Sequence, residues 1–199
     1  MNNELKSEDK EILQSLNRIV NIIKDALDKE AIDAAFFCSL SIPDIMGQFC
    51  YPELREYTNK NVVGKRYIRW YDEHVFKYEN PPLNKNYDDN IFQNINQIDG
   101  TILYAIRCKY FHQGSLVHNE VKSKLQKKYH KLIGSSEKEL KLDISFNSTG
   151  TSYGYSTTNY DNFVTIKVNI GKRDLSKILM LHGMQLLKVN KESLLLDSE

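Results

Sequence analysis

Two side chains in this sequence have the chemistry needed to cleave a phosphodiester bond. Arg107 and His112 are separated by four residues, in a stretch that ends at Gly114. An arginine is always charged and presents a planar fork of donors that fits a phosphate. A histidine takes up or releases a proton near neutral pH. The pair therefore predicts metal-independent cleavage of RNA, in which His112 moves a proton and Arg107 stabilises the charge on the phosphate.

A helix must carry this pair. Apolar residues recur at helical spacing before the motif, which predicts a long helix that ends near Gly114; they are Ile91, Ile95, Ile98, Ile102 and Ile106. Five positions on such a helix turn by about 500°, which leaves the two side chains about 140° apart. They form one site only if the helix frays or bends before Gly114, or if a second chain completes it in a two-fold dimer.

Lysines in and after the motif are the candidate substrate-binding residues. Lys109 lies inside the motif, and four more lysines follow the helical spacing i, i+3, i+4, i+7: Lys124, Lys127, Lys128 and Lys131. Such a stripe predicts a groove that tracks the phosphates of an RNA backbone. The alternative is a solvated helix face opposite Leu125 and Leu132.

Three further residues are assigned supporting roles. Cys108 directly follows Arg107, Gln113 directly follows His112, and Asp44 follows Pro43 at the expected start of a short helix. Asp44 is expected to orient a cation at the site. Its alternative role is that of an ordinary acid in the first turn of a helix, where the helix dipole favours negative charge.

The rest of the sequence predicts a mainly α fold. Helical periodicity recurs along the first 134 residues and again after Asp174, whereas residues 142–146 and 164–170 alternate between apolar and polar. We therefore expect a helical bundle over residues 1–134. An antiparallel β-hairpin and a C-terminal helix, over residues 135–199, are expected to pack on it as one structural domain.

Composition narrows the class of protein. The chain has 199 residues, 41% of them hydrophobic and 27% charged, with a net charge of +1, so neither a membrane protein nor a disordered chain is expected. The first residues lack the apolar core of a signal peptide, and the three cysteines are odd in number, which favours the cytoplasm. We find no metal-binding spacing and no phosphate-binding glycine loop, so no cofactor is expected.

With these residues in view, the chain resembles the HEPN superfamily, whose signature is an Arg and a His four to six residues apart near the end of a bundle helix. Arg107 and His112 match it. Further matches to a family of uncharacterised bacterial HEPN-like proteins are Ile42-Pro43-Asp44-Ile45, Gly64-Lys65-Arg66-Tyr67 with Trp70, Arg107-Cys108 and His112-Gln113-Gly114. The resemblance implies a homodimer with the motif at its interface. It also implies ribonuclease activity in toxin–antitoxin, phage-defence or stress systems, with an antitoxin or defence protein as a further partner.

The alternative function is a non-catalytic dimeric interaction module. In that case Arg107 pairs with a carboxylate and His112 stabilises the end of the helix, where a cationic side chain is favoured. Cys108 favours this alternative, because Asn, Asp or His commonly follows the Arg in active HEPN toxins and a thiol is a poor hydrogen-bond partner.

Overall fold

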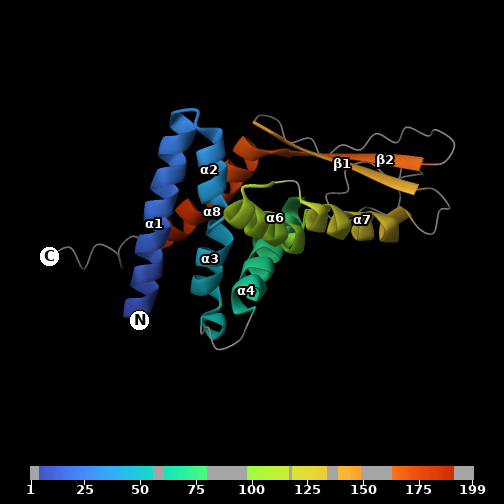
Figure 1. The fold of residues 1–199 in the computed structure, drawn as a ribbon. Helices are drawn as coiled ribbons and strands as arrows, with labels where there is room; N and C mark the ends of the chain where they lie inside the picture. The colour runs from blue at the N-terminus through green and yellow to red at the C-terminus, as the bar shows by residue number, and fades with distance from the viewer. Residues whose placement is uncertain are drawn as a thin grey trace. The chain divides into compact units, whose positions relative to one another are not determined.

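The computed structural model describes residues 5–55, 61–79, 98–116, 118–133, 139–148 and 163–190. These residues are mainly helical, as predicted, with one small sheet (Figure 1). The helices are α1 (Ser7–Asp28), α2 (Ile32–Ser39), α3 (Ile42–Cys50), α4 (Val62–Tyr71), α5 (Lys77–Glu79), α6 (Gly100–Gln113), α7 (Asn119–Ile133) and α8 (Lys172–Val189). A 3-10 turn, η1, spans Pro52–Leu54, and a π-helical segment, η2, spans Asp72–Phe76. The strands are β1 (Glu139–Asn147) and β2 (Phe163–Gly171).

The chain forms two compact units. The first contains Met1–Trp70 together with Lys172–Glu199, and the second contains Tyr71–Gly171. The expected division at residue 134 rests on a change of composition, and it differs from these units because α8 clusters with the N-terminal helices.

The first unit is built around the apolar stripe of α1. Its buried positions recur every three or four residues, which is the spacing of one helix face: Ile12, Leu13, Leu16, Val20, Ile23, Ala26 and Leu27. Helix α1 packs against α2, α3 and α8, and α8 also contacts α2 and α3. Helix α8 contributes the buried Leu175, Leu179 and Gly183. The C-terminal helix is therefore part of this core.

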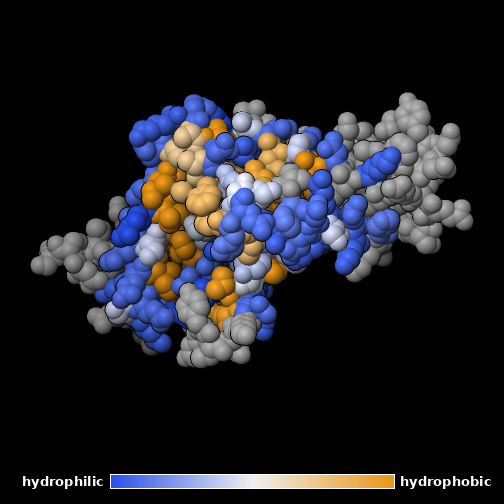
Figure 2. Space-filling model, viewed as in Figure 1, coloured by the Kyte–Doolittle hydropathy of each residue, from blue (hydrophilic) through white to orange (hydrophobic). Residues whose placement is uncertain are grey.

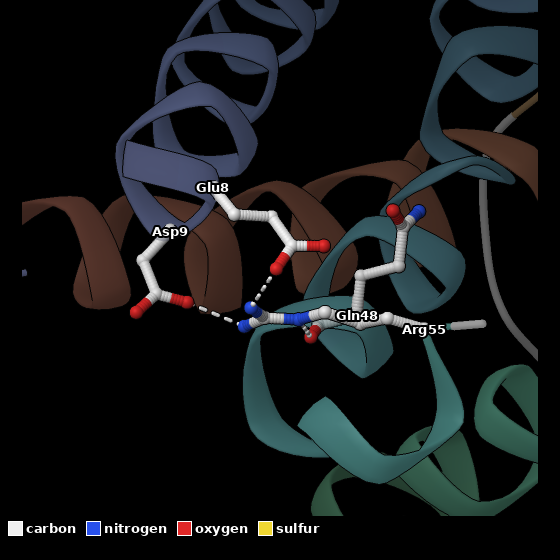
Figure 3. A network of polar contacts seen from close by, with 4 residues as sticks. All are labelled: Glu8, Asp9, Gln48 and Arg55. Atoms are coloured by element: carbon white, nitrogen blue, oxygen red, sulfur yellow. Dashed lines mark hydrogen bonds and ion pairs between the residues drawn. The ribbon is translucent and has the colours of Figure 1, made fainter. Parts of the chain in front are cut away.

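Arg55 ties the first turn of α1 to the end of α3. Its Nη1 lies 3.1 Å from Glu8 Oε2, its Nη2 lies 2.5 Å from Asp9 Oδ1, and its Nε donates to the carbonyl oxygen of Gln48 at 2.6 Å (Figure 3). The two acids also lie in the first turn of α1, where the helix dipole stabilises negative charge. One guanidinium thus fixes where α1 begins relative to α3.

The second unit contains α6, α7 and the sheet. Strand β1 pairs with β2 in parallel, from Glu139 opposite Phe163 to Asn147 opposite Gly171, so the predicted antiparallel direction is wrong. The alternation of apolar and polar residues predicts which face of a strand is buried. The pattern is the same whether two strands pair in parallel or antiparallel. The fifteen residues between Asn147 and Phe163 meet the length that a parallel crossover requires. Ile144, Val168 and Ile170 are buried, and β1 contacts α7.

Gly47 of α3 lies against the backbone of α4. A Cβ at this position would lie 2.9 Å from the carbonyl oxygen of Arg66, a backbone atom that cannot rotate away. We expect Gly47→Ala to lower the free energy of unfolding by about 1–3 kcal/mol, because overpacking must move a helix. Thermal denaturation followed by circular dichroism measures this change.

Gly183→Ala is the matched control. Its Cβ would lie 2.9 Å from Val20 Cγ2, a side-chain methyl group that can shift, so this substitution should cost less. Both glycines are helical, so the gain of about 1 kcal/mol in helix propensity is shared by both variants. Equal losses of stability in the two variants would contradict the explanation from backbone contact.

Candidate functional site

Two carboxylates fix the start of α6. Asp99 is the N-cap, with its side chain accepting a hydrogen bond from the Ile102 N–H at 3.1 Å. Asp72 Oδ1 accepts one from the Gly100 N–H at 2.6 Å. The helix therefore begins at Gly100, and Ile102 and Ile106 are buried as predicted.

The end of α6 is also as predicted. Gly114 adopts a left-handed conformation with φ 64°, and its N–H donates to the Tyr110 carbonyl at 2.9 Å. Ile98 is buried but precedes the N-cap Asp99, so its predicted place in the helix is wrong. Ile91 and Ile95 of the expected stripe lie outside the described residues.

The candidate pair, Arg107 and His112, lies on this regular helix. Helix α6 is α-helical through Gln113, so it does not fray between Arg107 and His112. The two positions are separated by about 7.5 Å along the axis and by about 140° around it. His112 is exposed and Arg107 is half-buried. One chain therefore directs the two side chains to different sides of α6.

Arg107 keeps unused hydrogen-bonding capacity. Its guanidinium carbon lies 4.9 Å from the centre of the Phe111 ring, one turn along the helix. Its Nε is buried and has no hydrogen-bond partner among the residues that the structure describes, and within the same residues no carboxylate pairs with it. Among the described residues, Arg107 therefore has a ring contact with Phe111 and no ion pair.

His112 shares its side of α6 with Cys108 and Lys109. Residues three and four positions apart are neighbours on a helix, and these two precede His112 by four and three positions. Cys108 is a half-buried free thiol, and Gln113 is exposed beside the histidine. On the same helix, Lys109 therefore lies nearer to His112 than Arg107 does.

Glu120 brings Lys109 and Lys124 together across α6 and α7. Its Oε2 lies 2.9 Å from Lys109 Nζ, and its Oε1 lies 3.7 Å from Lys124 Nζ. The hydrogen bond from Lys109 holds the pKa of the Glu120 carboxyl below its usual range, assisted by the charges of Lys109, Lys124 and His118. The carboxylate therefore remains ionised between the two lysines.

The remaining lysines of the stripe have different environments. Lys128 forms an ion pair with Asp99, beside Asp72, whose pKa is raised by burial. Lys127 is exposed, and the side chain of Lys131 lies outside the described residues. Because Glu120 pairs with the late part of α6 and Lys128 with its start, the two helices are antiparallel.

Helices α6 and α7 concentrate positive charge. Residues 100–133 contain seven Lys and Arg and a single acid, Glu120, whereas the whole chain has 27 Lys and Arg and 26 Asp and Glu. The described atoms over α7 are mostly hydrophilic (Figure 2). This α6–α7 pair, residues 100–133, is the strongest candidate surface for a polyanion.

Asp44 belongs to the first unit. Its Oδ1 accepts a hydrogen bond from Arg66 Nε at 2.6 Å, and Arg66 Nη1 donates to the Leu54 carbonyl at 2.9 Å. Arg66 is fully buried, so Asp44 supplies the counter-charge of a buried cation. Asp44 also lies in the first turn of α3. This position agrees with its alternative role, that of an ordinary acid favoured by the helix dipole.

Sequence reasoning missed two residues of the α6–α7 pair. Glu120 bridges the lysines, and His118 Nδ1 accepts a hydrogen bond from the Glu120 N–H at 3.1 Å. The available signal was charge: Glu120 is the one acid in residues 100–133.

Metal ligands and membrane-spanning helices are two other features that could define a site in the described residues. In that part of the chain, no group of three or more His, Cys, Asp or Glu side chains is placed to hold a metal ion. None of the helices described there has the length and apolar character needed to cross a membrane.

Comparison with known proteins gives no family. No family model, curated protein or solved structure matches this chain. The resemblance to the HEPN superfamily therefore stays a prediction that rests on the motif residues.

Proposed function

We propose that this chain is a HEPN-like RNA-binding protein whose α6 end forms a metal-independent endoribonuclease centre, acting in bacterial defence, toxin–antitoxin or stress responses. The observation that carries the proposal is the segregation of charge: seven cations and one acid lie in residues 100–133 of a nearly neutral chain. Clustered Lys and Arg bind a phosphate backbone and release its counterions. The same segment carries the exposed His112 and the half-buried Arg107.

The proposed reaction needs only proton transfer and charge stabilisation. His112 accepts the proton of a ribose 2′-hydroxyl, and the 2′-oxygen attacks the adjacent phosphorus. The bond from phosphorus to the 5′-oxygen breaks, that oxygen takes a proton from water, and His112 then releases the proton it accepted to solvent. The products are a 2′,3′-cyclic phosphate and a 5′-hydroxyl. Arg107 stabilises the additional charge on the phosphate oxygens, and the lysines of α6 and α7 hold the flanking phosphates.

A homodimer completes the proposed site. On one chain, Arg107 and His112 are about 140° apart around α6. A two-fold axis near the end of α6 lets Arg107 of one protomer act with His112 of the other. The catalytic unit in this proposal is therefore the dimer.

The second candidate function is a non-catalytic dimeric interaction module. It is favoured by the thiol that follows Arg107 and by the regular helix that separates the pair. In this case the basic surface binds an acidic partner, such as a cognate antitoxin or another defence protein.

Cleavage of RNA in EDTA separates the two functions. Wild-type protein is expected to release 2′,3′-cyclic phosphate ends from RNA in EDTA. His112→Ala is expected to slow cleavage by about 10²–10⁴, and Arg107→Ala by about 10²–10³. Arg107→Lys should not restore the rate, because an ammonium group lacks the bidentate fork. The rate of product formation, followed by gel electrophoresis, measures these changes.

His130→Ala is the control, because this histidine is also exposed and lies on α7. It should leave the rate within about threefold of wild type, since His130 has no proton to transfer in the proposed reaction. Cleavage that survives both Arg107→Ala and His112→Ala, or that stops in EDTA, would show that the assigned centre is wrong.

Mixing two inactive variants tests whether the site is shared between protomers. Light scattering should give about twice the chain mass of 23.2 kDa. After exchange of subunits, Arg107→Ala mixed with His112→Ala should regain about a quarter of wild-type activity. Half of the dimers are then mixed, and each has one of its two sites intact. A monomeric protein, or no recovery in the mixture although each variant dimerises, would contradict the shared site.

A further inference from the structure

Glu120 bridges two lysines of the α6–α7 pair. Its carboxylate lies between Lys109 Nζ on α6 and Lys124 Nζ on α7, at 2.9 and 3.7 Å. The Glu120 side chain is 46% exposed, and those of Lys109 and Lys124 are 25% and 38% exposed. All three groups are therefore accessible to a ligand that approaches from solvent.

The position of Glu120 is fixed by its backbone. It lies in the first turn of α7, and its N–H donates to His118 Nδ1 at 3.1 Å. The hydrogen bond from Lys109, followed by the charges of Lys109, Lys124 and His118, holds the pKa of its carboxyl low. A negative charge is thus attached to the first turn of α7, within the otherwise basic α6–α7 pair.

We infer that Glu120 occupies the position of an RNA phosphate between Lys109 and Lys124, and that RNA binds there by displacing it. This inference rests on the proposed function, because it concerns regulation of the same basic surface. Carboxylate and phosphate oxygens accept the same charge-assisted hydrogen bonds from lysine. Glu120 therefore acts as an internal competitor of the ligand.

The ion pairs of Glu120 with Lys109 and Lys124 are weak enough for a ligand to replace them. Exposed ion pairs contribute little to stability, so the two lysines can exchange Glu120 for a phosphate at small cost. A single phosphate only takes the place of the Glu120 carboxylate beside the two lysines, so it gains little binding free energy. A polynucleotide also reaches Lys127 and the other cations of the pair, and it releases counterions at each contact. Glu120 thus lowers the affinity for small anions and reserves the surface for an extended RNA.

Binding of an RNA that resists cleavage tests the inference. The probe is a fluorescein-labelled 2′-O-methyl oligouridylate of about twelve nucleotides, long enough to span several phosphates and lacking the attacking hydroxyl. Fluorescence anisotropy in low salt gives the dissociation constant. Glu120→Gln is expected to bind about fivefold more tightly than wild type or better, because both lysines lose their internal partner. Adding Lys109→Gln to Glu120→Gln should abolish most of this gain.

Asp25→Asn is the matched control. Asp25 Oδ2, on α1, lies 2.9 Å from Nζ of Lys29, the C-cap residue of that helix. This variant therefore removes one exposed acid paired to a lysine and changes the net charge equally. Its affinity should stay within about twofold of wild type. Glu120→Ala is the second variant and should behave like Glu120→Gln; the unfolding transition of each protein shows that it is folded.

The outcomes separate the inference from the proposed function. Equal affinity of wild type, Glu120→Gln and Asp25→Asn overturns the role of Glu120 and leaves RNA binding intact. An equal gain in Glu120→Gln and Asp25→Asn overturns it too, because net charge alone then explains the gain. Failure of all the folded proteins to bind the probe overturns RNA binding itself, and with it the inference.

Discussion

The candidate site depends on how α6 is rotated about its axis, that is, on which of its residues face the core. Asp99 and Asp72 accept hydrogen bonds from the first turn of the helix, and Gly114 ends it in a left-handed conformation. An N-cap of this kind contributes about 1 kcal/mol to helix stability. Once the start is fixed, Ile102 and Ile106 turn inward. The same rotation separates Arg107 from His112, and it places Lys109 beside the histidine.

Opposite charges hold α7 beside α6 at both ends. Asp99 pairs with Lys128 at the start of α6, and Glu120 pairs with Lys109 and Lys124 near its end. The lysines that the sequence presents as one uniform stripe therefore divide into bridging and exposed members. Among the described lysines of the stripe, Lys127 is exposed, whereas Lys124 and Lys128 pair with Glu120 and Asp99. These two acids therefore join α7 to α6.

Sequence reasoning reached the elements that depend on local periodicity. The burial of Ile102 and Ile106 and the glycine end at Gly114 follow from helix geometry alone, whereas Ile98 is buried ahead of the N-cap. The parallel direction of β1 and β2 does not, because alternation is identical in both directions. The bridge formed by Glu120 joins two helices, and its lysine partners are fixed by how α6 packs on α7. The engagement of Asp44 by the buried Arg66 likewise depends on the packing of α3 against α4.

The salt dependence of RNA affinity tests most directly whether the α6–α7 pair binds a phosphate backbone. The logarithm of the association constant should fall linearly with the logarithm of salt concentration. Lys127→Gln should reduce that slope by about 0.7, the value for one lost contact to a single strand. Lys177→Gln, which removes an exposed lysine from α8, should leave the slope unchanged. Binding that is independent of salt, or equal slopes for Lys127→Gln and the wild-type protein, would contradict the account.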